Sequence, residues 1–294
     1  MDTELLKLFI ETTQFGSFQK VADKNFVSQR AVSKRIGQLE DSLHVKLFLR
    51  ESNKITLTAA GTHFLKRAKQ LLAIINTTSY ELQSLDKNVE HQLSAGYFSP
   101  FDGAILKKAL FNLPDDISVT VKEAGIEHLV SDVLLGELDC AIIHNTADYH
   151  YNYQELGLSH FVVLADTNLI GVSALSPYAT RSSLAEETLQ EKPVIYYSNE
   201  ESDYLKKSFA ASLGKIADEI NIVRETSYEQ MQMLVSLNQA FAFYPGGIVD
   251  ELQSPTDKIV YLPLETANTQ DFTFEIICRT DNHKFSLRKF TGLL

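Results

Sequence analysis

Residues 16–50, GSFQKVADKNFVSQRAVSKRIGQLEDSLHVKLFLR, contain two short helical patterns separated by a break at 25–27. Ser17 and Ser28 each precede one of the patterns and can cap its first turn. The apolar residues of the second pattern, over 29–43, recur at helical spacing and form a buried face: Val32, Ile36, Leu39 and Leu43. Upstream of Gly16, a further helix is indicated by one apolar face: Leu5, Leu6, Phe9 and Ile10. A short helix, a tight turn and a second helix predict a helix-turn-helix.

The leading turns of the second predicted helix carry polar side chains that are suited to reading DNA. Gln can bind adenine through two hydrogen bonds, Arg and Lys can bind guanine, and Ser can reach phosphate. Any one of these residues alone is more often an ordinary solvated residue. Four of them beside a turn of this length favour a DNA contact: Gln29, Arg30, Ser33 and Lys34.

A wing is predicted directly after the second helix. Residues 45–50 and 55–58 are both extended in pattern, and the polar segment 51–54 between them has the composition of a turn. In such a wing Arg50 and Lys54 are available to backbone phosphates.

The charge of the chain is unevenly distributed. The net charge is −11, but residues 1–88 carry 13 Lys and Arg against 9 Asp and Glu, whereas residues 89–294 carry 14 against 29. Within 20–69 the counts are 11 basic and 4 acidic residues. A basic segment attached to an acidic remainder is typical of a DNA-binding domain fused to a domain that avoids DNA.

Residues 8–50 followed by ITLTAAG at 55–61 resemble the winged helix-turn-helix of LysR-type transcriptional regulators. The resemblance implies a DNA-binding domain over 1–58, with five residues on the DNA side: Ser28, Gln29, Arg30, Ser33 and Lys34. Arg30 stands where the family often has Pro or Ser, and His44 stands where Gly is usual. Because Arg30 adds a donor, we expect a half-site that differs from those of typical relatives.

A long linker helix is predicted over 59–89, with neither Pro nor Gly after Gly61. Its apolar positions follow alternating steps of four and three, which is the pattern of a coiled-coil seam: Phe64, Ala68, Leu71, Ile75, Thr78, Leu82, Leu85 and Val89. The alternative is a helix packed on its own domain. The seam predicts a homodimer, and the resemblance implies a tetramer.

The acidic remainder, 90–294, alternates apolar runs with helical segments, as an α/β domain does. Among its predicted strands, 161–165 and 169–171 are separate. Residues 134–142 and 230–245 resemble two segments of LysR effector domains. The resemblance implies a two-lobed domain like the periplasmic binding proteins, with two crossing strands. Lobe I would comprise 90–162 plus 268–294, and lobe II 163–267.

In this architecture the ligand is expected in a cleft lined by loops at the carboxyl ends of strands. Helix N-termini there offer free N–H groups. The candidate effector-binding residues in those loops are Ser99, Pro100, Phe101, His144, Thr146, Ser198, Ser227 and Tyr244. Their side chains suit a small polar or carboxylate effector, and the absence of Arg and Lys from these loops disfavours a multiply charged one.

Other classes of function find little in the sequence. The nucleotide-binding, nucleophile-elbow and zinc-protease motifs of enzymes are missing, so we expect no catalysis and no cofactor beyond an effector. His144 and His150 near Asp148 are spaced too loosely to favour a metal. Cys140 and Cys278 lie in apolar runs, which favours buried structural thiols over a redox pair. Neither a secretory signal nor a membrane-spanning run is present, and a cytoplasmic location is expected.

Together these patterns predict an α+β multidomain protein with three parts: a winged helix-turn-helix, a linker helix and a two-lobed α/β effector domain. The predicted function is sequence-specific, effector-controlled transcriptional regulation on double-stranded DNA. The alternative is a ligand-independent repressor or architectural protein whose C-terminal domain only oligomerises.

Overall fold

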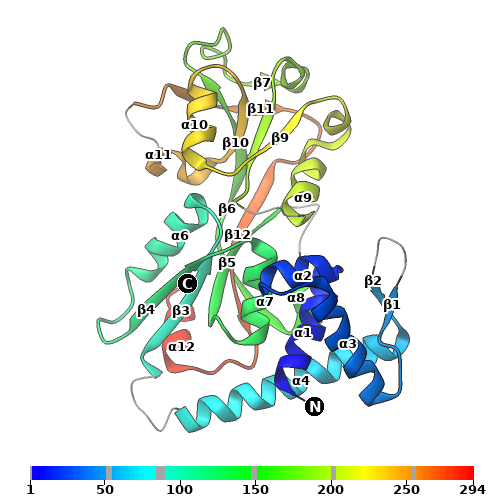
Figure 1. Cartoon of the computed structure of the whole chain (residues 1–294). Helices are drawn as coiled ribbons and strands as arrows, with labels where there is room; N and C mark the ends of the chain where they lie inside the picture. Colours follow the sequence, from blue (N-terminus) through cyan, green and yellow to red (C-terminus); the bar gives the residue numbers. More distant parts are fainter. Residues whose placement is uncertain (1, 51–54, 84–89, 147–150, 200–202, 253–255) are drawn as a thin grey trace. The chain divides into compact units, whose positions relative to one another are not determined.

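The computed structural model describes residues 2–50, 55–83, 90–146, 151–199, 203–252 and 256–294 (Figure 1). The chain forms two compact units. One comprises residues 1–90 with 134–137, and the other comprises 91–133 with 138–294. Each unit is described by itself below.

The first unit opens with three helices, α1 (Thr3–Phe15), α2 (Phe18–Lys24) and α3 (Gln29–Leu43). Ser17 and Ser28 cap α2 and α3 as predicted, because each side-chain oxygen accepts a hydrogen bond from a backbone N–H three residues on. The predicted apolar faces meet in one core, in which these side chains are buried: Leu6, Phe9, Ile10, Val21, Ala22, Val32, Ile36 and Leu39. The helix-turn-helix predicted from residues 16–50 is confirmed.

The wing is confirmed as an antiparallel pair, β1 (Phe48–Arg50) and β2 (Ile55–Leu57), with Phe48 opposite Leu57. The buried carboxylate of Glu40, in α3, fixes the backbone at the start of β1. Glu40 accepts hydrogen bonds from the N–H groups of Leu47 (2.9 Å) and Phe48 (3.2 Å) and pairs with Lys46 at 3.0 Å. Burial acts to raise the pKa of Glu40, but these hydrogen bonds and the Lys46 charge outweigh it and lower the pKa below its usual value.

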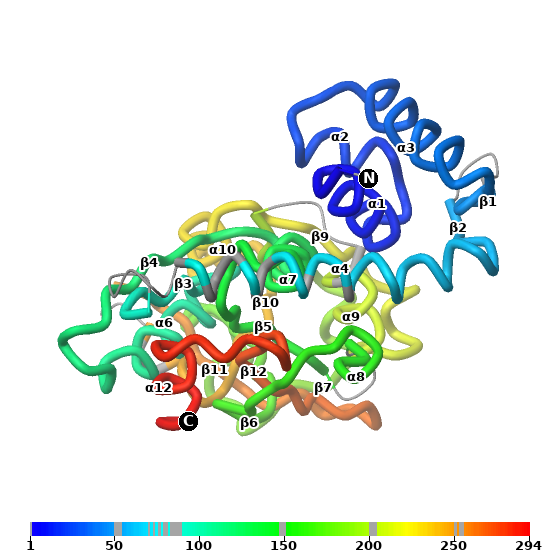
Figure 2. Tube along the Cα trace, turned by 90° about the horizontal axis from the view of Figure 1, so that it is seen from below, coloured from blue at the N-terminus to red at the C-terminus, as the bar shows by residue number. Residues whose placement is uncertain are grey.

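Helix α4 (Ala59–Gln83) is long, and α1, α2 and α3 gather beside its first half (Figure 2). The first two seam positions are filled by the chain's own domain: the Phe64 ring lies 5.0 Å from that of Phe9, and Ala68 is fully buried in the same core. The seam prediction was therefore wrong at these positions. Leu71, Ile75 and Leu82 are exposed and keep the predicted spacing. Leu85 and Val89 lie outside the described residues.

The second unit has two α/β lobes built on one continuous sheet. In the first lobe the strand order is β4 (Ser118–Glu123), β3 (Gln92–Tyr97), β5 (Cys140–Thr146), β12 (Asp271–Arg279) and the first part of β6 (Leu158–Ser173). Its helices are α6 (Pro100–Leu110), α7 (Ile126–Leu135), α8 (Tyr153–Leu156) and α12 (Phe285–Thr291).

In the second lobe, β6 continues between β10 (Phe241–Pro245) and β11 (Ile259–Glu265). Beyond β10 lie β8 (Val194–Tyr197) and β9 (Ile222–Glu225), and β11 also pairs with β7 (Leu184–Ala185). Its helices are α9 (Asp203–Leu213), α10 (Tyr228–Ser236), α11 (Val249–Leu252), η1 (Glu186–Glu191), η2 (Gly214–Asp218) and η3 (Gly246–Ile248).

Strands β6 and β12 pass side by side between the lobes (Figure 1). β6 pairs with β12 as far as Thr167 and with β10 and β11 from Asn168 onward. The prediction of separate strands at 161–165 and 169–171 was wrong, since both belong to β6. The change of partner at Asn168 lies a few residues beyond the lobe boundary expected at 162/163.

Candidate nucleic-acid interface and ligand pocket

The start of α3 and the turn before it form an exposed surface of the first unit. All six residues from Asn25 to Arg30 are exposed, although the domain core begins at Val32. Gln29, Arg30 and Lys34 are exposed on the leading turns, and Ser33 is half-buried. Ser28 is held in place as the cap of α3, with its hydroxyl 3.2 Å from the N–H of Ala31.

The charged residues in this part of the sequence are all basic. Between Lys24 and Glu40 the sequence contains Arg30, Lys34 and Arg35 and has no acidic residue. An exposed helix start with cations and amides matches the geometry by which a recognition helix enters the major groove. Arg50 ends β1, and the described part of the structure includes neither its side chain nor Lys54.

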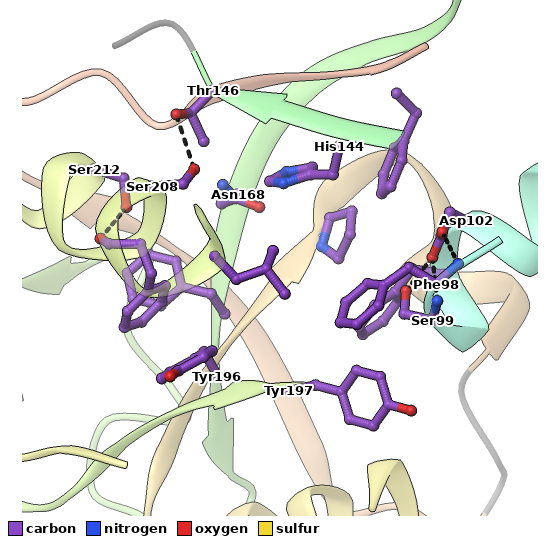
Figure 3. Close-up of a pocket in the computed structure, with 16 residues that line it drawn as sticks. Phe98, Ser99, Asp102, His144, Thr146, Asn168, Tyr196, Tyr197, Ser208 and Ser212 are labelled. Carbon is purple, nitrogen blue, oxygen red and sulfur yellow. Dashed lines mark hydrogen bonds between the residues drawn. The ribbon is translucent and has the colours of Figure 1, made fainter. Parts of the chain in front are cut away.

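A cavity of about 110 Å³ lies between the two lobes of the second unit (Figure 3). Both lobes contribute to its lining. From the first lobe come Phe98, Ser99, Phe101, Asp102, His144, Thr146 and Phe274. From the second come Asn168, Tyr196, Tyr197, Leu205, Ser208, Phe209, Ser212, Phe243 and Pro245.

One end of the pocket is the start of α6. The buried carboxylate of Asp102 accepts hydrogen bonds from the N–H groups of Phe98 (2.6 Å) and Ser99 (2.7 Å), and also from the Ser99 hydroxyl. Burial raises the pKa of Asp102 to about 6, against the lowering effect of these bonds. The helix therefore carries its own anion at its N-terminus, where a polar or carboxylate group of the effector had been expected.

Aromatic rings form much of the remaining wall. The ring of Phe209 lies 5.4 Å from that of Tyr196 and 5.1 Å from that of Phe243, while Phe98 lies 5.6 Å from Tyr197. The His144 ring lies 5.1 Å from that of Phe274. Burial lowers the pKa of His144 to about 4, so its imidazole is neutral near pH 7.

The lobes are tied together at the pocket wall. The hydroxyl oxygens of Thr146, in β5, and Ser208, in α9, lie 3.2 Å apart and share a hydrogen bond. One turn further along α9, Ser212 donates to the carbonyl oxygen of Phe209 at 2.8 Å. Ser99 and Asp102 lie on the opposite side of the pocket (Figure 3).

The structure brings four of the eight predicted effector-binding residues into this pocket: Ser99, Phe101, His144 and Thr146. The other four, Pro100, Ser198, Ser227 and Tyr244, are not among its lining residues. Ser198 is fully buried, the Ser227 hydroxyl caps α10 by accepting from Gln230 N–H at 3.2 Å, and the buried Tyr244 hydroxyl donates to Gln232. The side chains of Ser227 and Tyr244 therefore stabilise the fold of the second lobe.

Sequence reasoning missed several lining residues that carried a readable signal. Asp102 follows Ser99 by three positions, which is the spacing of a capping box. Ser208 and Ser212 are four residues apart and therefore share one face of α9, where both are buried. The aromatic lining carried no such signal, because Tyr196 and Tyr197 have the composition of any buried strand.

Cys140 and Cys278 are buried and face each other across β5 and β12 as free thiols. Burial raises the pKa of Cys278 to about 11 and raises the pKa of Cys140 well above its usual value, so both remain protonated. In the described residues no group of three or more His, Cys, Asp or Glu side chains could hold a metal ion, and Asp148 and His150 lie outside them. Across the same residues, no helix has both the length and the apolar character to cross a membrane.

Comparison with known proteins matches both units. Residues 3–62 match the family described as "Bacterial regulatory helix-turn-helix protein, lysR family". Residues 108–294 match the "LysR substrate binding domain". The HTH-type transcriptional regulator TfdT of Cupriavidus pinatubonensis is 28% identical over 214 residues, which cover 67% of this chain and 85% of TfdT. The HTH-type transcriptional activator AllS of Klebsiella pneumoniae is 36% identical over 94 residues, 32% of this chain and 35% of AllS.

Solved structures show the same fold. A full-length OxyR variant from Pseudomonas aeruginosa superposes with a TM-score of 0.58 at 19% identity, covering 100% of this chain and 99% of OxyR. CbnR, described as a LysR family transcriptional regulator, gives a TM-score of 0.53 at 19% identity, covering 100% and 99% of the two chains. The family matches span the recognition helix as well as most of the lining of the pocket. The chain thus belongs to the LysR family of DNA-binding transcriptional regulators, with an N-terminal helix-turn-helix domain and a C-terminal effector-binding domain.

Proposed function

We propose that this regulator responds to a small, uncharged molecule of about the size of one ring, which binds in the pocket between the lobes. The observation that carries the proposal is that both lobes line a single cavity and meet at its wall through Thr146 and Ser208. A ligand held there contacts both lobes at once. Its binding energy therefore depends on how closely the lobes approach each other.

The size of the effector follows from the volume of the cavity. About 110 Å³ is somewhat less than the ~150 Å³ of an engineered apolar cavity that accepts benzene. The aromatic walls formed by Tyr196, Phe209 and Phe243 offer flat apolar surfaces for a ring. Hydroxyl and amide groups of Ser99, Thr146 and Asn168 can fix the orientation of one or two polar substituents.

The charge of the effector follows from the titratable lining. Of the described residues around the pocket, Asp102 carries a negative charge near pH 7, His144 is neutral, and none is Lys or Arg. Two like charges about 6 Å apart repel by about 3 kcal/mol at an effective dielectric constant of ~20. A carboxylate effector, which the sequence had left open, is therefore disfavoured against an uncharged molecule of the same shape.

Binding would reach the DNA through the quaternary structure. We propose a homodimer in which the exposed residues Leu71, Ile75 and Leu82 of α4 pair with those of a second copy. An effector changes the spacing of the DNA-reading heads only to the extent that it binds one lobe arrangement more tightly than the other. The bases read by each head stay the same.

A pocket-filling variant tests the proposal. Ser208→Leu should remove the response to effector in a reporter assay, because the larger side chain occupies the cavity. Operator binding without effector should stay within about twofold of the unmodified protein. Ser182→Leu, at an exposed position of the second lobe, is the matched control and should respond normally. A normal response of Ser208→Leu, in a protein shown to be folded by circular dichroism, would rule out the pocket as the effector site.

A further inference from the structure

The turn between α2 and α3 contains a phenylalanine in a position that favours glycine. Phe26 has φ +53°, in the left-handed region. Its N–H donates to the carbonyl oxygen of Asp23 at 3.3 Å, and the N–H of Val27 donates to that of Ala22 at 3.0 Å. This pair of bonds is a Schellman motif, in which the residue at the place of Phe26 is usually Gly because a Cβ is disfavoured there.

The same domain provides two comparisons. Helix α1 ends at Gly16, with φ +58°. Helix α3 ends in a second Schellman motif, in which His44 has φ +55°. The N–H of His44 donates to the backbone carbonyl oxygen of Asp41, and the N–H of Val45 donates to that of Glu40. The glycine at α1 shows that this domain uses the favoured residue at one such position. A bulky residue at Phe26 is therefore unfavourable for the backbone.

The Phe26 side chain does not compensate for this through packing. It is 96% exposed, the highest value among the large apolar residues of the described chain, so its ring adds nothing to the core. An exposed phenyl ring on a strained backbone is destabilising on both accounts. Such a residue is best explained by a contact that forms only when a partner is bound.

The position of Phe26 indicates which partner. Phe26 lies two residues before Ser28, the cap of α3, within the exposed run 25–30 and in a stretch free of acidic residues. In a helix-turn-helix the N-terminal residues of the second helix contact base edges in the major groove. The turn just before that helix is therefore carried to the DNA. The apolar group that the major groove offers to a phenyl ring is the C5-methyl group of thymine.

We propose that Phe26 is a further specificity residue, which packs against the C5-methyl group of a thymine in the operator. The contact adds apolar recognition to the hydrogen bonds available from Gln29 and Arg30. It requires the DNA-binding function of the family but is independent of the effector pocket.

The test compares Phe26→Asn with His44→Asn in the full-length protein. Asn tolerates the left-handed conformation, so each change should raise the Tm of the N-terminal domain by a few degrees. Only Phe26→Asn should weaken binding to the operator selected from random DNA, by about tenfold. Phe26→Leu, which keeps an apolar side chain, should retain most of the affinity.

Replacing single thymines of the operator by uracil removes the C5-methyl group alone. At one position per half-site this replacement should weaken binding by the unmodified protein several-fold and leave binding by Phe26→Asn unchanged. Unchanged operator affinity of Phe26→Asn would overturn the contact with DNA and point to a protein partner. A loss of affinity in Phe26→Asn without any thymine at which the two proteins differ would overturn the methyl contact.

Discussion

Thr146 and Ser208 share a hydrogen bond of 3.2 Å that joins β5 of the first lobe to α9 of the second at the wall of the pocket. This bond favours the arrangement in which the lobes lie close together. A hydrogen bond of this kind contributes about 0.5–1.5 kcal/mol. It is therefore strong enough to bias the two lobes and weak enough for a ligand to override.

We predict that Thr146→Val and Ser208→Ala each weaken effector binding by about three- to tenfold, because the close arrangement is less populated. The double variant should lose no more than either single variant, since both remove the same bond. Isothermal titration calorimetry of the three variants with the effector measures the coupling between the two hydroxyl groups, with Ser182→Ala as the control. Losses that add in the double variant would show that the two hydroxyl groups act separately.

The raised pKa of Asp102 predicts a pH-dependent selectivity. Its folded-state pKa of about 6 lies above the usual value of 3.8, so the stability linked to Asp102 is full below pH ~4 and is lost as pH rises through 6. Protonation also removes the charge that repels anions. Affinity for benzoate should therefore increase from pH 7.5 to pH 5.5, while affinity for benzamide stays constant. Tighter binding of benzoate than of benzamide at pH 7.5 would contradict an uncharged effector.

Glu40 predicts the opposite pH dependence in the DNA-binding domain. Its pKa is lowered in the folded state, so the stability it contributes is present above the unfolded value and is lost as pH falls through the folded one. Glu40→Gln should destabilise the domain by about 1–3 kcal/mol, because the N–H groups of Leu47 and Phe48 lose a charged acceptor. The stability difference between the two proteins should shrink in acid. A difference that stays constant from pH 7 to pH 3 would exclude this role.

The exposed positions of α4 predict how the protein dimerises. Leu71→Glu combined with Leu82→Glu should place like charges in the seam and yield monomers by analytical ultracentrifugation. Operator affinity should fall sharply, because each half-site then binds one head alone. Ile74→Glu is the matched control, since Ile74 is 63% exposed but lies off the seam. A dimer that survives the double change would place the interface elsewhere.

Arg30 and Lys54 are expected to make different kinds of contact with DNA, the first to a base and the second to a backbone phosphate. Arg30→Ala should relax the preference at one base pair at a loss of about 1–3 kcal/mol, because Arg30 is exposed on the leading turn of α3. Lys54→Ala, in the predicted turn of the wing, should weaken binding to every sequence and reduce the salt slope by about one. Equal losses on specific and random DNA for Arg30→Ala would remove Arg30 from the base-reading set.

The helix-turn-helix was predictable because its capping serines and apolar faces are local patterns. The continuity of β6 was not. Asp166, Thr167 and Asn168 have the composition of a turn, yet they lie in the strand where it crosses between the lobes and is open to solvent. Polar residues suit an exposed stretch of strand as well as they suit a loop, so the sequence pattern does not distinguish the two.

The effector pocket was predictable in part. The rule that ligands bind at the carboxyl ends of strands located the loops of Ser99 and Thr146, which line the cavity. The same rule selected Ser198 and Ser227, which also follow strands but do not line the pocket. The backbone N–H of Ser198 donates to Glu225 in β9, and the Ser227 hydroxyl caps α10. Which side chain faces a cavity depends on contacts between lobes, and those contacts are distant in sequence.

Strand β12 has a consequence for how the chain folds during synthesis. It lies between β5 and β6 in the first lobe, although the strands and helices of the second lobe separate it from both of them in the sequence. Until β12 has been synthesised, β5 and β6 lack their shared neighbour and the first lobe stays incomplete. The DNA-binding domain contains no strand of this sheet and has no such dependence. Termination of synthesis between β6 and β12 would therefore leave a DNA-binding domain able to fold, attached to an incomplete effector domain, and such a product would compete for the operator without responding to effector.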